Sequence, residues 1–224
     1  MVNAKKGDFV EIKYTGYANG EMFDSNIEED LKKAKSKNPP RKTIIKLGEK
    51  MIVPGLDSAL EGKEVGNKYD VIVSVKEGFG ERKRELMKTI PLKVFTERKI
   101  YPEAGMMLTL DDQLVRISAV SGARVIVDFN NPLAGKTLEY KVEIVRIVDD
   151  DNEKARALFE WMFRFAPEFE VRDKVIIKGP QVFESIAKSF SPKFKELMGK
   201  ELGFELKEEK KEGEKIKESS PKND

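Results

Sequence analysis

The sequence contains neither cysteine nor histidine among its 224 residues. Without cysteine there can be no disulfide framework and no thiol catalysis, and without histidine the usual proton shuttle and the commonest zinc ligand are missing. The chemistry of serine triads and of catalytic zinc therefore lies outside what this chain can support.

Long apolar runs and a charge excess of one sign are missing as well. No stretch of about 18 apolar residues occurs, and the N-terminus MVNAKKGDFVEIKY is amphipathic where a signal peptide would have an apolar core. The 42 basic and 40 acidic residues leave a net charge of +2, which argues against a dedicated nucleic-acid binder. We therefore expect a cytoplasmic protein without a membrane or nucleic-acid partner.

The apolar residues, 39% of the chain, suffice for a substantial core. Alternation of apolar and polar residues predicts half-buried strands over residues 8–17, 43–47, 69–75 and 138–148. Residues 28–42, between the first two strands, are highly charged and end in a proline pair and a basic pair. This segment favours a solvated helical bulge, and a regulatory or partner-binding role for it stays open.

Two stretches organise the first part of the chain. In GEMFDSN, residues 20–26, a glycine turn delivers Phe23 and Asp24 to the end of an extended segment. In LGEKMIVPGLDSALEG, residues 47–62, an apolar run breaks at Pro54 into a short helix, because proline suits the first helical position. We expect an apolar floor with one carboxylate at its rim. One face of that helix would carry Leu56, Ala59 and Leu60.

A series of short motifs within the first 80 residues resembles the FKBP-type peptidyl-prolyl cis-trans isomerases. Each motif alone is weak, whereas six in the same order at compatible spacing are specific. They are YTG at 14–16, GEMFDS at 20–25, LG at 47–48, IVPG at 52–55, ALEG at 59–62 and GFG at 78–80. The resemblance implies an α+β fold in which an antiparallel sheet wraps on a short helix, and an enzyme that isomerises X-Pro bonds.

The resemblance also implies which residues form the site. Taken one at a time, its apolar members are typical of an ordinary core, and Asp24 is typical of a turn. Leu56 stands where many family members have tryptophan and Phe79 where they have tyrosine, which argues against tight macrolide binding. The Val53 N–H is expected to hold the substrate carbonyl. The implied site residues are Tyr14, Phe23, Asp24, Ile52, Val53, Leu56, Phe79 and Tyr140.

After the GFG motif the chain departs from a minimal isomerase domain. Strand patterns at residues 107–110, 114–120 and 124–129 predict a β-rich insertion. This arrangement resembles the SlyD-like branch of the family, in which an inserted flap captures unfolded chains and presents their prolines to the isomerase. The predicted division is therefore an isomerase domain at 1–87 and 131–149 with a flap at 88–130.

Within the predicted flap, methionine and leucine side chains are candidates for binding unfolded chains, because methionine-rich surfaces adapt to many partners. They are Met106, Met107, Leu108 and Leu110. Core packing is the alternative and applies to about half of such residues. The chain lacks the His- and Cys-rich tail of SlyD, so we expect neither a metal nor a cofactor. The whole protein is predicted to be an isomerase and folding chaperone; a non-catalytic holdase or a Pro-motif scaffold is the alternative.

Residues 150–204 resemble the C-terminal extension of long archaeal family members. The pattern predicts a helix ended by Pro167, a strand over 171–178, a helix over 182–190 and a further helix starting at Ser191. A charged, flexible tail is predicted at 205–224.

This C-terminal module is rich in aromatic residues. Eight of the 13 phenylalanines and the single tryptophan, Trp161, follow Asp149. A segment of this size buries little surface alone, which favours a homodimer through the module. The alternatives are that the module docks on the isomerase domain or that it binds unfolded client chains; either would also cover these side chains.

Overall fold

A computed structural model of the chain describes residues 2–207, and these divide into two units at Val148 and Asp149. Among the helices of residues 2–207, none has the length and apolar character needed to cross a membrane.

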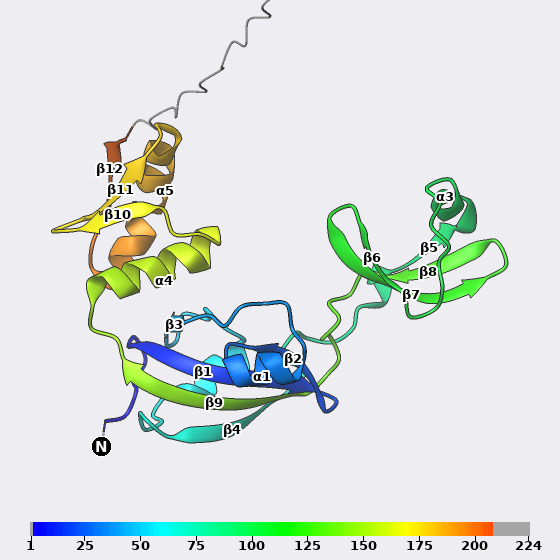
Figure 1. Cartoon of the computed structure of the whole chain (residues 1–224), viewed down its shortest axis with the longest axis horizontal. Helices are drawn as coiled ribbons and strands as arrows, with labels where there is room; N and C mark the ends of the chain where they lie inside the picture. The colour runs from blue at the N-terminus through cyan, green and yellow to red at the C-terminus, as the bar shows by residue number, and fades with distance from the viewer. Residues whose placement is uncertain (1, 208–224) are drawn as a thin grey trace, which may run out of the picture. The chain divides into compact units, whose positions relative to one another are not determined.

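The first unit is built on a five-stranded antiparallel sheet. β1 (Phe9–Ala18) lies at its centre beside β9 (Leu138–Ile147), and β4 (Lys68–Val73) follows β9 (Figure 1). On the other side of β1, β3 (Thr43–Lys46) pairs with its first half and β2 (Glu21–Ser25) with its second half. All four strands expected from alternation are confirmed, with ends shifted by one or two residues.

The core of this unit lies between the sheet and α2 (Pro54–Leu60). Pro54 begins the helix because the first helical residue needs no N–H bond, and Leu56 and Leu60 then turn into the core at 2% and 0% exposure. The buried Asp57 accepts from the backbone N–H groups of Gly48 and Lys50, at 3.1 and 2.9 Å, and so fixes the loop before the helix. The predicted fold class, an antiparallel sheet on a short helix, is confirmed.

The charged segment between β2 and β3 contains α1 (Glu28–Lys33) and is only partly solvated. Leu31 is 5% exposed, and the Thr15 hydroxyl donates to Asp30 Oδ2 at 2.6 Å. The bulge is therefore helical as predicted, and it is also anchored to β1 through Asp30, while Leu31 is buried.

Residues 87–128 form a second antiparallel sheet with a core of its own. The order is β5 (Met87–Pro91), β8 (Arg124–Asp128), β7 (Gln113–Ser121) and β6 (Met107–Leu110), and α3 (Leu92–Thr96) adds Phe95 to the core. A short 3-10 helix, η1 (Arg84–Leu86), precedes it. The sequence missed β5 and α3, because only Ile90 of β5 packs against this core and its alternation is correspondingly weak.

The second unit packs two helices on a small sheet. Its elements are α4 (Asp151–Phe163), β10 (Glu168–Val171), β11 (Val175–Gly179), α5 (Val182–Met198) and β12 (Leu202–Leu206), with β10 antiparallel and β12 parallel to β11. The rings of Phe159 and Phe194 are fully buried, with centroids 4.8 Å apart. Figure 1 shows α4 and α5 with these strands.

Three expectations for the strands and for the ends of elements in this unit were wrong. α4 ends at Phe163, not at Pro167, because Arg164 adopts a left-handed conformation (φ 66°). The strand expected over 171–178 is a hairpin of β10 and β11, and β12 extends two residues into the expected tail. The rest of that tail lies outside the described residues.

The two helices expected after residue 181 are one helix, α5, with Pro192 inside it. An internal proline costs about 3 kcal/mol. The apolar face nevertheless continues from Ala187 to Phe194 and Leu197, all at most 2% exposed, and this burial on both sides of Pro192 offsets the cost.

Exposed ion pairs cover the surface of the second unit. Hydrogen bonds from Arg172 and Lys178 lower the pKa of Glu170 to about 2. A hydrogen bond from Lys195 is the first cause that lowers the pKa of Glu201 to about 2 as well. Both carboxylates are more easily ionised in the folded chain than the ordinary value of 4.5 implies, so their stabilisation is present above about pH 4.5 and lost as the pH falls towards 2.

We expect the thermal midpoint of this unit to fall between pH 5 and 2, and to fall less in a Glu170→Gln, Glu201→Gln variant. Fluorescence of Trp161, which lies in α4, reports this unit alone. Glu160→Gln is the matched control, because Glu160 forms no ion pair within residues 2–207. If the thermal midpoint depended equally on pH in the unmodified chain, the double variant and the control, the ion pairs of Glu170 and Glu201 would not be the cause.

Candidate active site

Three polar side chains meet beside the core face of β1. Tyr14 of β1 donates its hydroxyl to Asp24 Oδ2 of β2 at 2.7 Å. Arg41, from the end of the bulge, donates through Nη2 to the same hydroxyl at 3.2 Å and to Asp24 Oδ2 at 3.3 Å. Tyr14 is 7% exposed, whereas the Arg41 side chain is 63% exposed. We call these residues the hydrogen-bonded trio; it joins the core to the surface.

Burial, followed by the hydrogen bond to Asp24, raises the pKa of Tyr14 to about 12. The pKa of Tyr140 is also raised, and burial is again the largest cause. Both hydroxyls therefore stay protonated at neutral pH and can donate hydrogen bonds without titrating.

An aromatic cluster of Tyr14, Phe23 and Tyr140 stands beside the trio. The Phe23 ring meets that of Tyr140 edge-on, with centroids 5.8 Å apart and an angle of 85°, and the Tyr14 and Tyr140 rings lie 6.3 Å apart. Gly16 makes this packing possible: a Cβ atom there would lie 2.6 Å from Phe23 Cζ and 2.9 Å from Tyr140 Cε1. A larger residue would have to displace the rings.

The residues before and inside α2 adjoin this cluster. Leu56 belongs to the same buried cluster as Tyr14 and Tyr140, and Ile52 and Val53 pack against it while staying partly exposed. The Val53 carbonyl accepts from Leu56 and Asp57 at 3.0 Å. Its N–H makes no hydrogen bond to another group within residues 2–207, so a donor at the helix start is free for a ligand.

Phe79 belongs to the loop after β4, which is tied to the start of α2. The Gly55 N–H donates to the Glu77 carbonyl at 2.9 Å, and a Gly55 Cβ would lie 2.6 Å from Val73 Cγ1. The Phe79 ring is 37% exposed, so it is the most accessible apolar residue of the predicted set.

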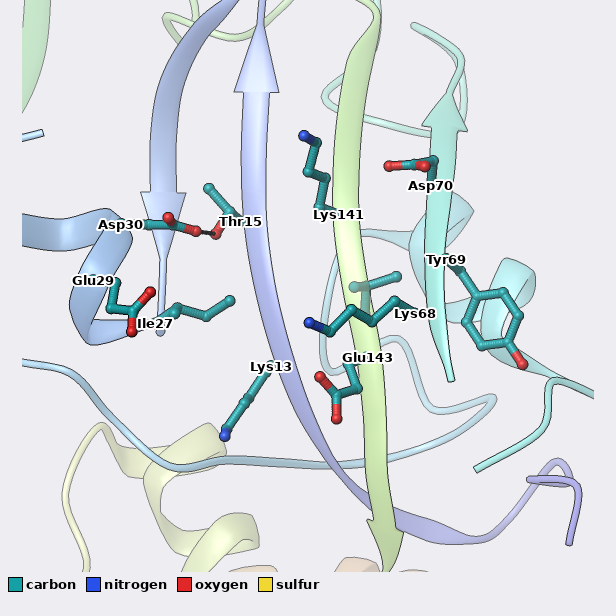
Figure 2. Close-up of a pocket in the computed structure, with 11 residues that line it drawn as sticks. Lys13, Thr15, Ile27, Glu29, Asp30, Lys68, Tyr69, Asp70, Lys141 and Glu143 are labelled. Carbon is teal, nitrogen blue, oxygen red and sulfur yellow. Dashed lines mark hydrogen bonds between the residues drawn. The ribbon is translucent and has the colours of Figure 1, made fainter. Parts of the chain in front are cut away.

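A separate hollow of about 510 Å³ lies on the opposite face of the same sheet (Figure 2). Strand residues alternate between faces, so Lys13 and Thr15 line it while Tyr14 does not. Figure 2 shows mainly charged side chains around it, and none of the predicted site residues contributes. Its lining is Lys13, Thr15, Ile27, Glu29, Asp30, Lys68, Tyr69, Asp70, Lys141, Val142 and Glu143.

The four predicted flap residues divide in two. Met106 and Met107 are 39% and 44% exposed, whereas Leu108 and Leu110 pack against the core of the second sheet. Of these four residues, the two methionines are therefore the ones exposed to a partner.

Sequence reasoning missed two contributors to the candidate site. Arg41 lies in a segment interpreted as a solvated bulge, and a lysine- and arginine-rich stretch gives no sign that one guanidinium reaches β1 and β2. Gly16 was part of a motif, but its close approach to two rings depends on tertiary packing. No metal centre is indicated: within residues 2–207, no group of three or more carboxylates could hold a metal ion.

Fold and site together define a class: an α+β protein whose wrapped antiparallel sheet carries hydrogen-bonded aromatic residues beside a short helix. The family model for FKBP-type peptidyl-prolyl cis-trans isomerases matches residues 2–145. The chain belongs to this family and is an enzyme of this type.

Curated relatives agree with that assignment. The chain is 31% identical over 159 residues to a short-type peptidyl-prolyl cis-trans isomerase of Methanocaldococcus jannaschii, a match covering 68% of this chain and 100% of the relative. It is also similar to the FKBP-type isomerase SlyD of Haemophilus influenzae (38% over 102 residues) and of Escherichia coli (36% over 110). These two matches cover 44% and 48% of this chain and 53% and 56% of the relatives, about half of each.

Proposed function

We propose that the chain isomerises X-Pro bonds in unfolded polypeptides at an apolar site formed by the aromatic cluster, the start of α2 and Phe79. The observation that carries this proposal is the free Val53 N–H beside partly exposed apolar side chains and the hydrogen-bonded trio. The proline ring would pack on the apolar groups while Val53 holds the carbonyl.

Rotation about the X-Pro amide needs no nucleophile, metal or proton transfer. The barrier is about 18–20 kcal/mol because resonance is lost in the twisted form. An apolar surround disfavours the more polar planar amide, and donors positioned for the twisted form lower the barrier further. Each reduction of about 1.4 kcal/mol increases the rate tenfold.

The experiment that tests this function is peptide isomerisation by pocket variants. Asp24→Ala removes the acceptor shared by Tyr14 and Arg41 and should lower kcat/KM by about tenfold or more, because losing such a partner costs about 1–3 kcal/mol. Phe79→Ala should also lower it by removing apolar contact. Asp70→Ala, an exposed β4 carboxylate in the opposite hollow, is the matched control. Unchanged rates in both site variants, with native circular dichroism, would remove the assignment.

We further propose that residues 87–128 act as a flap that holds unfolded chains. Exposed apolar side chains on this insert support the proposal, above all Met106, Met107 and Leu114 at 39%, 44% and 55% exposure. Membership of the isomerase family disfavours the alternative of a holdase without catalysis. Such a protein would suppress aggregation yet leave short X-Pro peptides at their uncatalysed rate, so the peptide assay separates the two.

A homodimer through the second unit remains our expectation, although burial of Phe159 and Phe194 within the unit weakens the need for it. Phe165, Val182 and Leu206 stay 49%, 61% and 54% exposed. Light scattering at micromolar concentration should give twice the chain mass for the full protein and the single mass for residues 1–149. A monomeric full-length protein would contradict the dimer.

A further inference from the structure

A cluster of positive charge begins where α1 turns into the loop before β3. Residues 31–42 carry six cations and no carboxylate, whereas the three acids of the segment fall at residues 28–30. The function proposed above leaves this cluster unused, apart from Arg41.

Ion pairs account for four of the six cations. Lys32 pairs with Glu28 at 2.6 Å and Lys33 with Asp30 at 3.6 Å. Lys42 pairs with Glu11 at 3.5 Å, and Arg41 pairs with Asp24 as described above. The remaining cations are Lys35 and Lys37, which are exposed and form no ion pair within residues 2–207.

The loop that carries these lysines is fixed at both ends. Its start is held where the Ser36 N–H donates to the Leu31 carbonyl at 2.9 Å, and Leu31 is buried. Its end is held where Arg41 contacts Tyr14 and Asp24. Lys37 precedes Arg41 by four residues, so the two backbones are at most about 14 Å apart. An unpaired cation therefore stays near the candidate active site.

We propose that Lys35 and Lys37 form a basic rim that selects prolines flanked by acidic residues in the substrate chain. Arg41, at the end of this loop, contacts Tyr14 of the aromatic cluster. A substrate proline bound at the cluster would therefore bring the residues on either side of it towards the loop. Exposed charges on the substrate and on the loop attract each other weakly across water, and salt screens this attraction. The rim therefore favours Asp or Glu near the isomerised bond and disfavours Lys or Arg.

This inference rests on the proposed isomerase site, and a peptide series separates the two. The probes are hexapeptides Ala-Ala-Phe-Pro-Ala-Ala with blocked ends, carrying Glu, Ala or Lys at the first position, the last position or both. Exchange NMR measures kcat/KM without a coupling protease. At low salt, we expect kcat/KM for the Glu peptide to be about three- to tenfold higher than for the Lys peptide, with the charge on at least one side of the proline. This is about the effect expected for two screened charges. The difference should shrink in 0.5 M NaCl.

The variant Lys35→Gln, Lys37→Gln should lose most of this preference while keeping the rate on the alanine peptide. The matched control Lys68→Gln, Lys141→Gln removes the same charge from the opposite face of the sheet and should keep the preference. Equal rates for the Glu, Ala and Lys peptides, or a preference that survives the Lys35 and Lys37 changes, would overturn the basic rim and leave the isomerase site standing. Failure to accelerate any peptide would instead overturn the proposed function.

Discussion

Replacing residues 88–129 with a short Gly-Ser linker is expected to spare isomerisation of short peptides and to reduce catalysis of protein refolding by about 100-fold. Met87 and Asp128 are paired across β5 and β8, so the chain enters and leaves the insert at neighbouring points that a short linker can join. The insert has its own core, so its loss removes no packing from the five-stranded sheet. A tethered second binding surface raises the effective substrate concentration by about two orders of magnitude or more, and this advantage would be lost.

The comparison uses one proline-limited refolding protein and one tetrapeptide, measured with the same enzyme preparations. Met106→Ser with Met107→Ser is the milder variant, because it changes exposed side chains and leaves Phe95 and the other core residues in place. It should lower the refolding rate without altering the tetrapeptide rate. A parallel loss of both activities in either variant would show that the proposed division of labour is wrong.

Gly16→Ala is expected to produce the largest loss of peptide isomerisation from a single added methyl group. The new Cβ atom would lie 2.6 Å from Phe23 Cζ and 2.9 Å from Tyr140 Cε1, so at least one ring must move. Such overpacking costs about 1–3 kcal/mol, and a displaced wall residue should lower kcat/KM by about tenfold or more.

Gly203→Ala is the matched control for Gly16. Its Cβ would lie 2.6 Å from Ile176 Cδ1 in the second unit, the same closest distance as at Gly16, although it would meet one side chain there and not two. Both variants should lose some thermal stability, but only Gly16→Ala should lose activity. Combining it with Phe23→Leu replaces the overlapping ring by a shorter side chain. The double variant should therefore regain part of the packing and lose less of its melting temperature than Gly16→Ala alone. Full activity of Gly16→Ala would contradict a site lined by Phe23 and Tyr140.

The strands and the short helix of the five-stranded sheet could be predicted from the sequence, because apolar and polar residues alternate along the strands and the motifs are short and local. Tyr14 belongs to the apolar residues that recur at the strand period in β1, and Leu56 to those that recur at the helical period in α2. Which residues face the core therefore follows from spacing alone. Pro192 shows the limit of that reasoning. A proline is a reliable local signal for a helix boundary, but burial of Ala187, Phe194 and Leu197 on both sides of it depends on tertiary contacts.

The candidate site divides in the same way. Asp24 and Phe23 were predicted from one short motif, whereas the contact of Arg41 with Asp24 joins residues 17 positions apart across a charged bulge. Long-range contacts of this kind leave no periodic trace in a single sequence.

The most direct test of the central claim is to map a proline peptide onto the isotopically labelled full chain by NMR. We predict that amide signals of Val53, Leu56 and Phe79 shift with peptide concentration, and that the Tyr14→Phe, Asp24→Ala variant weakens these shifts. Signals of Lys68 and Lys141, in the hollow on the opposite face, should stay in place. Peptide-dependent shifts confined to that hollow, with Val53 and Phe79 unchanged, would contradict the account.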